Sequence, residues 1–310
     1  MEKIRADLLQ KLKREMERAD ITFAENVPMS RYTSFKAGGN AAVLAEVRDT
    51  DRLRALLALT SQEGVPHILL GNGSNTLFKD SGYEGVVIKL SQDFAKVSVD
   101  PDGCTAAAGT AVLLSSLART LLSEGLTGFE FASGIPGSLG GALFMNAGAY
   151  GGEMKQVVKS VRAIAPDGGA ERVFSAEEMD FGYRHSVLAE NGYIAVEAVI
   201  SLEKGDKEKI AEKMKDLTAR RNSKQPVNYP SAGSTFKRPE GYFAGKLIED
   251  AGLKGVSVGG AQVSVLHSGF IINRGGAAAS DIIQLMEIVQ SRVFDEFGVK
   301  LEPEVRIIGE

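Results

Sequence analysis

The sequence predicts an α+β fold in three successive units, of which the first two form one domain and the third lies over it. In each unit, strand-length apolar runs occur between amphipathic stretches of helical period. A hairpin pattern at 157–174, with two strands around a DGG turn, indicates that part of the sheet is antiparallel. The chain has 310 residues, enough for two or three domains. We place the units at residues 1–90, 91–205 and 206–310.

The first unit combines two helices with three strands. The spacing of apolar residues predicts a helix over 4–16, and a second helix that begins with Thr50 as its N-cap and stops near Gly64. The predicted strands are 43–47, 67–70 and 85–90. The strand at 67–70 leads directly into GNGSN at 71–75, so a glycine loop follows a strand end.

The second unit opens with two paired strands, at 97–99 and 104–109, and a helix over 110–124 that stops at Gly125. The hairpin of strands 157–165 and 171–174 follows, and the apolar run at 194–201 closes the unit.

The third unit begins with a charged helix over 206–222 and a loop that contains AGSTF. A helix carries Phe243, Leu247, Ile248 and Ala251 on one face, and a strand follows in GFIINRGG. A long helix runs from Ser280 to Gly298, and VKLEPEVRII at 299–308 is expected to be the terminal strand.

The bulk composition excludes several classes of protein. The net charge of −4 argues against nucleic-acid binding, which needs a basic surface. The sequence has no apolar run long enough to span a membrane and no signal peptide, so we expect a cytoplasmic protein. A single cysteine excludes an internal disulfide, and three scattered histidines without HExxH or CxxC predict no metal site. No feature points to an obligate protein partner.

Two glycine clusters are the candidates for a ligand site. GNGSN consists of Gly71, Asn72, Gly73, Ser74 and Asn75, and its backbone N–H groups could converge on a pyrophosphate. A plain tight turn explains this motif equally well, and it does not have the GxGxxG form of a Rossmann loop. The second cluster is GFEFASGIPGSLGGALFMNAGAYGGE at 128–153, where glycines alternate with apolar residues instead of the polar residues of a linker. This pattern indicates close approach of the backbone to a large flat ligand.

Seven motifs in order identify a family resemblance: RYTSFKAGGN, LGNGSN, the 128–153 cluster, FGYRHS, PSAGSTFKRP, AGLKG and LEPEVRIIG. Together they resemble the UDP-N-acetylenolpyruvoylglucosamine reductases of peptidoglycan precursor synthesis, over residues from about 31 to 309. The resemblance implies an FAD-binding domain of the p-cresol methylhydroxylase type, in two parts, and a C-terminal substrate domain. It also implies that the enzyme reduces a UDP-sugar enolpyruvyl ether, with NADPH as co-substrate.

The resemblance further implies the residues of the site. The catalytic residues map to Arg184, Ser234 and Glu304. The FAD contacts map to GNGSN and to Ser133, Gly134, Ile135, Pro136, Gly137, Gly140, Gly141, Asn146 and Gly148. Tyr183 is a substrate contact. Neither SGIPGSLGG nor GNGSN contains histidine or cysteine, so we expect the FAD to be bound non-covalently.

The chemistry of the reaction suits these residue types. A guanidinium such as Arg184 can hold the substrate carboxylate in a bidentate fork and stabilise negative charge that develops next to it. A protonated Glu304 could donate a hydrogen bond to the same oxygens. Ser234 could protonate the α-carbon as a general acid. Strand alternation puts Glu302 and Glu304 on one face and does not choose between them, so only the resemblance selects Glu304.

Other interpretations remain open for several positions. Without the resemblance, Arg184 is an ordinary surface or salt-bridged arginine, and Ser234 is a turn serine. Arg220, Arg221 and Lys224 form a basic patch that could hold the substrate diphosphate or the 2′-phosphate of NADPH, or could simply complement a helix C-terminus. Lys224 is our candidate for a substrate contact.

The sequence also departs from the better-studied form of the family. That form has asparagine where Arg238 stands, and an extra tyrosine-bearing loop after the GYR motif, so this chain resembles a shorter variety. Arg238 and His267 are our candidates to take over part of substrate binding. Two rival functions are an oxidase with covalently attached flavin and a flavin carrier without activity. The first is disfavoured by the glycine loops, and the second by the presence of all three catalytic residues.

Overall fold

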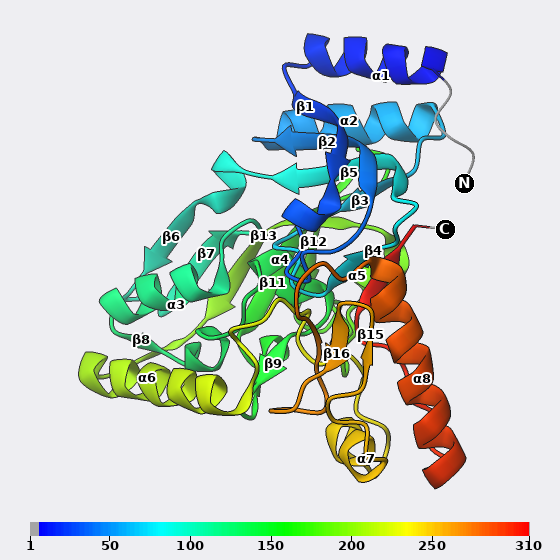
Figure 1. The fold of residues 1–310 in the computed structure, drawn as a ribbon. Coiled ribbons are helices and arrows are strands. Elements are labelled where there is room, and N and C mark those ends of the chain that lie inside the picture. Colours follow the sequence, from blue (N-terminus) through cyan, green and yellow to red (C-terminus); the bar gives the residue numbers. More distant parts are fainter. Residues whose placement is uncertain (1–5, 310) are drawn as a thin grey trace.

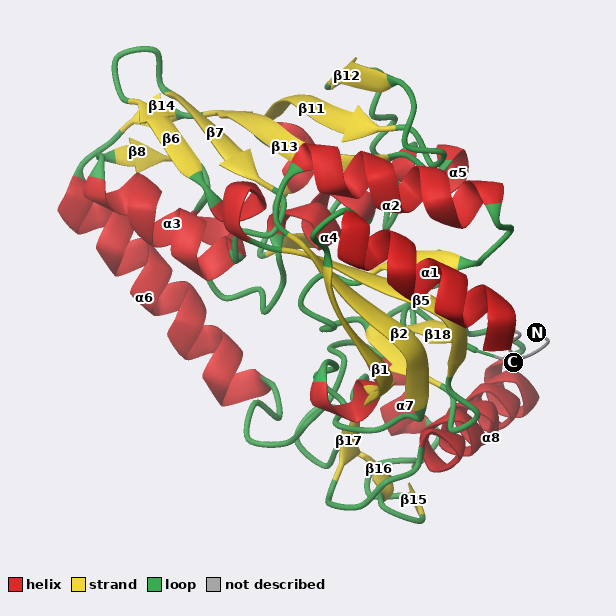
Figure 2. Cartoon of the chain, turned by 90° about the horizontal axis from the view of Figure 1, so that it is seen from above, coloured by secondary structure: helices red, strands yellow, loops and turns green. Residues whose placement is uncertain are grey.

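The computed structural model describes residues 6–309. The first part of the chain forms a small four-stranded sheet that is covered by two helices. The sheet has the order β1 (Thr22–Pro28), β2 (Asn40–Val47), β5 (Tyr83–Leu90) and β3 (His67–Leu69). β1 is antiparallel to β2, whereas β5 is parallel to both β2 and β3. The helices α1 (Ala6–Arg18) and α2 (Thr50–Gln62) lie side by side over one face of this sheet (Figure 2).

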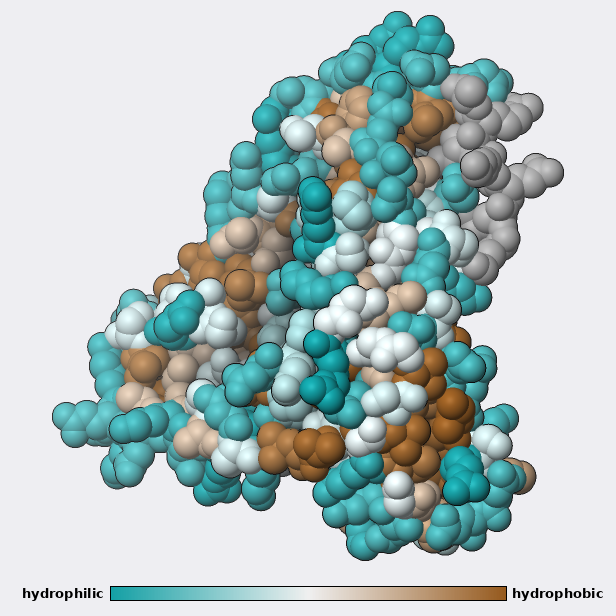
Figure 3. All heavy atoms as spheres, viewed as in Figure 1, coloured by the Kyte–Doolittle hydropathy of each residue, from teal (hydrophilic) through white to brown (hydrophobic). Residues whose placement is uncertain are grey.

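The amphipathic pattern of α1 explains its position. Leu12 and Met16 are fully buried in one core cluster with Leu53, Leu56 and Leu57 of α2. The outer side of α1 is hydrophilic, and it forms the teal upper end of the face in Figure 3. The apolar spacing predicted this helix, although the first two residues of the predicted range, 4 and 5, lie outside the described residues.

The second sheet is antiparallel throughout and has five strands in the order β12-β11-β13-β7-β6. Their bounds are β6 (Val97–Asp100), β7 (Thr105–Gly109), β11 (Val158–Ile164), β12 (Glu171–Ser175) and β13 (Ile194–Ser201). The predicted hairpin is confirmed as β11 and β12, which pair around the DGG turn. The helices of this part are α3 (Leu114–Ser123), α4 (Leu139–Phe144) and α5 (Leu188–Asn191). The next helix, α6 (Lys207–Lys224), which opens the third predicted unit, packs against α3.

The C-terminal part packs one long helix against a three-stranded antiparallel sheet. The strands are β15 (Ser257–Val258), β16 (Ala261–Val263) and β17 (Ile271–Asn273), and the helices are α7 (Ala244–Asp250) and α8 (Ala279–Phe297). α8 and α6 lie on opposite sides of the molecule (Figure 1). Short strand pairs complete the chain: β8 (Leu126–Thr127) with β14 (Glu203–Lys204), and β9 (Gly148–Ala149) with β10 (Gly152–Glu153).

The chain end returns to the first unit, and this return brings distant motifs together. β18 (Arg306–Ile308) pairs in parallel with β4 (Thr76–Phe78), which directly follows GNGSN. The buried side chain of Asn273 donates from Nδ2 to the carbonyl oxygen of Phe35 at 2.9 Å. The Asp80 carboxylate accepts hydrogen bonds from the backbone N–H groups of Ala279 and Ser280, both at 2.8 Å, so a residue of the first unit caps α8.

Three local predictions were wrong. The N-cap of α2 is Asp49, whose side chain accepts from Arg52 N at 2.9 Å, and Thr50 is the first helical residue. α3 begins at Leu114 instead of residue 110, because Thr110 is tied to the second sheet through a hydrogen bond from its Oγ1 to Ala195 O at 2.8 Å. The terminal strand covers only Arg306–Ile308, and residues 299–305 have an irregular backbone. The predicted boundaries between the three units stay predictions.

No helix in the described part of the chain is both long and apolar enough to cross a membrane.

Candidate active site

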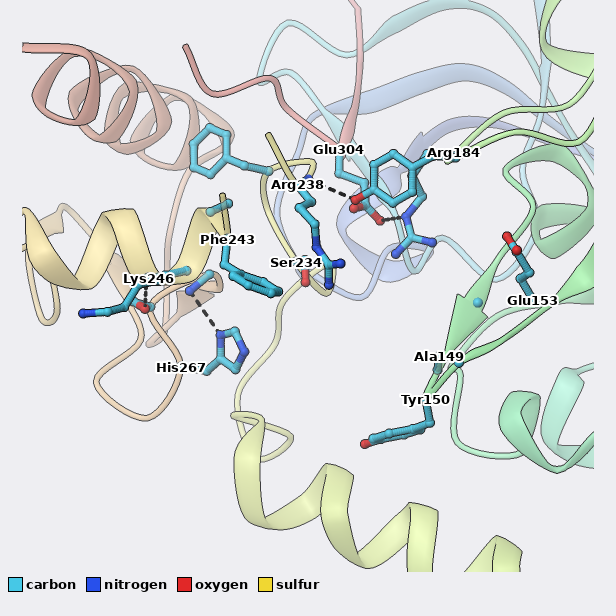
Figure 4. Close-up of a pocket in the computed structure, with 18 of the residues that line it drawn as sticks. Ala149, Tyr150, Glu153, Arg184, Ser234, Arg238, Phe243, Lys246, His267 and Glu304 are labelled. Atoms are coloured by element: carbon cyan, nitrogen blue, oxygen red, sulfur yellow. Dashed lines mark hydrogen bonds and ion pairs between the residues drawn. The ribbon is translucent and has the colours of Figure 1, made fainter. Parts of the chain in front are cut away.

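A cleft of about 680 Å³ lies between the β9–β10 hairpin, the turn at 182–185 and the C-terminal part of the chain. It brings together most of the predicted catalytic and substrate-binding residues, from segments far apart in sequence. The predicted site residues that line it are Asn146, Gly148, Tyr183, Arg184, Ser234, Arg238, His267 and Glu304. Figure 4 shows the labelled side chains around this space.

Arg184 and Glu304 form an ion pair at the inner end of the cleft. Arg184 Nε lies 2.7 Å from Glu304 Oε1, although the two residues are 120 positions apart in the chain. The Glu304 side chain is only 8% exposed. Burial raises the pKa of the Glu304 carboxyl above its usual value, and the charge and hydrogen bond of Arg184 offset this shift only in part. Glu304 therefore keeps its proton to a higher pH than an exposed glutamate.

Glu302 lies outside the cleft, and the predicted sharing of one strand face by Glu302 and Glu304 was wrong. The Glu302 side chain is 67% exposed and pairs with Lys237 Nζ at 3.4 Å. The alternation fails because this segment is not a regular strand. It is held instead by backbone bonds to the loop at 235–237: Glu304 N donates to Thr235 O and Lys237 N donates to Glu302 O, both at 2.8 Å.

Ser234 stands in a loop whose backbone is held by its neighbour Thr235. The N–H of Thr235 donates to Gly269 O at 2.8 Å, and Thr235 Oγ1 accepts from Ile271 N at 3.0 Å. Gly233 precedes Ser234 with a φ of +76°, a left-handed conformation that favours glycine. Figure 4 shows Ser234 on the side of the cleft that faces Arg184 and Glu304.

The outer end of the cleft combines a cation, aromatic rings and a neutral imidazole. The Arg238 guanidinium lies 4.6 Å from the ring centroid of Phe243, and Arg238 N donates to Tyr183 Oη at 2.9 Å. Burial lowers the pKa of His267, and its Nδ1 accepts from Gly269 N at 3.1 Å. The neutral ring therefore carries its proton on Nε2.

Sequence reasoning missed several residues that line this cleft, among them Tyr150, Glu153, Phe243 and Lys246. The signal for Tyr150 and Glu153 was their place in GAYGGE, since polar and aromatic side chains among glycines are candidates for ligand contact. The sequence assigned Phe243 to the apolar face of a helix, whereas it stands at the N-cap of α7 with 63% of its surface exposed.

The two glycine loops lie against each other beside the cleft. Asn72 Nδ2 donates to Pro136 O at 2.9 Å, and a Cβ added to Gly71 would lie 2.5 Å from Ser138 Oγ. Asn75 joins these loops to the inner end of the cleft, because its Nδ2 donates to the backbone oxygen of Glu304 at 3.0 Å. The loops that sequence reasoning linked to one ligand are thus neighbours in space.

The glycines of these loops fall into two kinds. Gly73 is needed for packing within the protein, because it has a φ of +64° and a Cβ there would lie 2.0 Å from Tyr32 O. Gly140 is similar, since a Cβ would lie 3.0 Å from the Thr110 side chain. At Gly137 and Gly141, by contrast, an added Cβ would make only ordinary van der Waals contacts, at 3.7 Å or more. Packing within the protein therefore does not require glycine at these two positions, which fits a close approach of the expected dinucleotide to the backbone there.

The three basic residues near the end of α6 have different surroundings in the structure and do not form one patch. Arg220 pairs with Asp216 at 2.8 Å. Arg221 lies against Gly134, where a Cβ would be 3.4 Å from its Cδ, and burial lowers the pKa of Arg221. Lys224 is the exposed last residue of α6 and does not line the cleft, so its contact with substrate stays a prediction. Within residues 6–309, no three His, Cys, Asp or Glu side chains gather in a way that could hold a metal ion.

Comparison with known proteins identifies the family. Residues 225–308 match the family described as UDP-N-acetylenolpyruvoylglucosamine reductase, C-terminal domain, and residues 41–173 match an FAD binding domain. The chain is 52% identical over 303 residues to the UDP-N-acetylenolpyruvoylglucosamine reductase of Caldanaerobacter subterraneus subsp. tengcongensis, with 98% of each chain covered. The chain belongs to the UDP-N-acetylenolpyruvoylglucosamine reductase family.

Two further relatives agree with this assignment to the reductase family. The reductase of Alkaliphilus oremlandii is 52% identical over 283 residues, which cover 91% of this chain and 92% of that protein. The crystal structure of UDP-N-acetylenolpyruvylglucosamine reductase from Thermus caldophilus superimposes with a TM-score of 0.79 at 35% identity, covering 93% of this chain and 99% of the other. The protein is therefore an FAD-dependent oxidoreductase, and the predicted fold of an FAD-binding domain followed by a C-terminal domain is confirmed.

Proposed function

We propose that the protein reduces the enolpyruvyl ether of UDP-N-acetylglucosamine to UDP-N-acetylmuramate, with NADPH as the source of electrons. The observation that carries the proposal is the ion pair of Arg184 with the buried side chain of Glu304, in a cleft that Ser234 also lines. This end of the cleft can receive a carboxylate and a reacting carbon together. The UDP-sugar and NADPH are metabolites of the cytoplasm, where we expect the protein to act.

Arg184 and Glu304 receive the carboxylate of the enolpyruvyl group. When bound, reduced FAD supplies a hydride to the terminal CH₂ carbon of this group, and negative charge then spreads from the adjacent carbon into the carboxylate. The Arg184 guanidinium stabilises that charge because it is permanently positive. A protonated Glu304 donates a hydrogen bond to the same oxygens, and its raised pKa supports this role.

Ser234 donates the proton that completes the reaction. The α-carbon gains the Ser234 Oγ proton while the hydride electrons form the new C–H bond at the CH₂ carbon, so the double bond becomes a single bond. A serine hydroxyl is a weak acid in water, but the cations Arg184 and Arg238 line the same cleft and stabilise the oxygen anion that remains.

The outer end of the cleft suits the nucleotide diphosphate of the substrate. Arg238 and the Nε2–H of His267 are donors for phosphate oxygens, and the Tyr183 hydroxyl holds the backbone of Arg238 in place. Lys224 extends this positive region from α6 in our proposal. These residues replace the tyrosine-bearing loop that the chain lacks.

In this proposal FAD contacts the two glycine loops and two residues that follow them. The contacts are Gly71, Asn72, Gly73, Ser74, Asn75, Ser133, Gly134, Ile135, Pro136, Gly137, Gly140, Gly141, Asn146 and Gly148. The glycines at 137 and 141 support it, because packing within the protein does not require glycine at either position. Neither loop contains histidine or cysteine, which supports non-covalent binding. NADPH uses the same cleft as the sugar substrate in a separate half-reaction.

An anaerobic absorbance experiment tests this function. NADPH should bleach the yellow flavin of the purified protein, and the colour should return only when the enolpyruvyl UDP-sugar is added. Return of colour in air but not with the sugar would show an oxidase instead. A flavin that NADPH does not bleach would refute the proposed source of electrons.

A further inference from the structure

Arg184 is presented to the cleft by a tight turn with an unusual backbone. Gly182 and His185 close the turn with two hydrogen bonds, from Gly182 N to His185 O at 3.1 Å and from His185 N to Gly182 O at 3.3 Å. Tyr183 and Arg184 occupy its tip, and both line the cleft. Arg184 has a φ of +55°, in the left-handed region that side chains other than glycine, asparagine and aspartate rarely adopt.

Such a strained conformation persists only where the surrounding structure holds it. The ion pair with Glu304 holds the side chain of Arg184, but it does not hold the base of the turn. Two buried polar residues do. Asn146 Nδ2 donates to Gly182 O at 3.0 Å, and Ser186 Oγ donates to Phe144 O at 2.8 Å. The turn is thereby fixed to residues 144–146 at the end of α4.

Asn146 is suited to this position by its own backbone and side chain. Its φ of +44° is left-handed, a conformation that asparagine tolerates. Its side chain is 2% exposed, and both of its polar atoms have partners in the protein. Besides Gly182 O, Nδ2 donates to Glu153 Oε2 at 2.8 Å, and Oδ1 accepts from Lys155 N at 2.9 Å. The side-chain amide therefore connects the end of α4 with residues 153–155 and with the turn at 182–185.

We propose that Asn146 is a positioning residue for Arg184, and that its hydrogen bond to Gly182 O maintains the left-handed turn that aims the guanidinium at the substrate carboxylate. Ser186 supports the same turn from its other side. This inference rests on the proposed function, because the role of Arg184 in the reaction is part of it. Asn146 is already predicted to contact FAD, and the positioning role is a second role, in the reduction of the sugar.

The substitution Asn146→Asp isolates the hydrogen bond. Aspartate keeps the size of the side chain, its tolerance of positive φ and the acceptor for Lys155 N, but it has no N–H to donate to Gly182 O. In stopped-flow absorbance, we expect oxidation of the reduced flavin by the enolpyruvyl UDP-sugar to slow by about 10- to 100-fold, the effect of misplacing a catalytic group. Because Asn146 is also a predicted FAD contact, flavin content and reduction by NADPH are measured on the same variant, and the rate of oxidation by the sugar is compared per bound flavin. Slowing of flavin reduction by NADPH to the same degree as oxidation by the sugar would refute the positioning role, because a misplaced Arg184 affects only the reaction with the sugar.

Two further variants separate this bond from its neighbours. In Asn146→Asp with Glu153→Gln, the amide at 153 can donate to the new carboxylate, which restores the contact between these side chains while Gly182 O stays without its donor. This double variant should remain slow, and recovery of the rate would refute the proposal. Ser186→Ala should slow the same half-reaction, and an unchanged rate would show that the turn needs no such support.

Asn273→Asp is the matched control. Asn273 is another buried amide, which donates to Phe35 O and accepts from Gly275 N away from the cleft lining. This change should lower Tm without slowing oxidation of the flavin by the sugar, whereas a comparable slowing would show that any buried amide has the same effect.

A crystal structure of Asn146→Asp provides a readout that does not depend on the reaction. The turn should be displaced, and the 2.7 Å contact between Arg184 Nε and Glu304 Oε1 should be lost. An unchanged φ at Arg184 would overturn the inference even if the proposed function holds. Failure of the unmodified protein to be oxidised by the sugar would instead refute the proposed function, and the crystal structure would still decide the role of Asn146.

Discussion

In the proposed mechanism, replacing Glu304 by alanine removes a hydrogen-bond donor at the point where negative charge develops. We compare this change with Glu304→Gln and Glu302→Ala. The two glutamates are two positions apart, yet Glu304 is 8% exposed and pairs with Arg184, whereas Glu302 is 67% exposed and pairs with Lys237. The structure therefore predicts very different effects for two chemically identical substitutions.

The size of the effect follows from the geometry. Loss of one preorganised donor to a developing anion costs about 3 kcal/mol in transition-state stabilisation. At 1.36 kcal/mol per decade, this corresponds to a decrease in kcat of about 150-fold for Glu304→Ala. Glu304→Gln should lose less, because the amide still donates a hydrogen bond. Glu302→Ala should stay within about twofold, because an exposed ion pair contributes about 1 kcal/mol or less to stability and nothing to the cleft.

The assay is steady-state turnover at saturating UDP-sugar and NADPH, with flavin content measured for each variant. Glu304 has a raised pKa and acts in its protonated form in the proposed mechanism, so kcat should fall as pH rises through that pKa. The Glu304→Gln variant, which cannot titrate, should lack this limb of the profile. If Glu302→Ala proves more damaging than Glu304→Ala, the assignment of the buried acid is wrong.

Three further outcomes are expected. The protein should be yellow and should release its FAD on denaturation by acid or heat, and flavin that remains on the precipitate would contradict non-covalent binding. Ser234→Ala should leave flavin reduction by NADPH intact but slow oxidation by the sugar by ~100-fold to 10,000-fold, the range for a lost general acid, in stopped-flow absorbance. Asp80→Ala should lower the free energy of unfolding by about 1 kcal/mol, as for other lost helix caps, measured by urea titration. Burial opposes ionisation of Asp80, but the hydrogen bonds from Ser280 and Ala279 outweigh it and lower the pKa of the carboxyl below 3.8. The stabilisation of α8 by the Asp80 cap is therefore present above pH 3.8 and is lost as pH falls through the lowered pKa. The alanine variant should show a weaker loss of Tm over that acid range.

Local sequence patterns predicted most of the regular elements, because their signals lie within one element. The apolar spacing in α1 and α8 follows the helical period, and Gly298 ends α8 with a φ of +67°. The hairpin of β11 and β12 was predicted for the same reason, from two apolar runs around a glycine turn. Element starts were less well predicted where a side chain from elsewhere competes, as at Thr110, which hydrogen-bonds to Ala195 O.

The sequence by itself also determined the family, since seven motifs in the same order are specific to one family and are recognised without knowledge of the tertiary contacts. It could not decide between Glu302 and Glu304, because alternation assumes a regular strand and the chain is irregular at 299–305. Only the return of the chain end to β4, and the backbone bonds of this segment to residues 235–237, bury one acid and expose the other. The left-handed turn at Arg184 and its attachment to Asn146 were equally invisible in the sequence, because the bonds that hold a strained backbone come from residues distant in the chain.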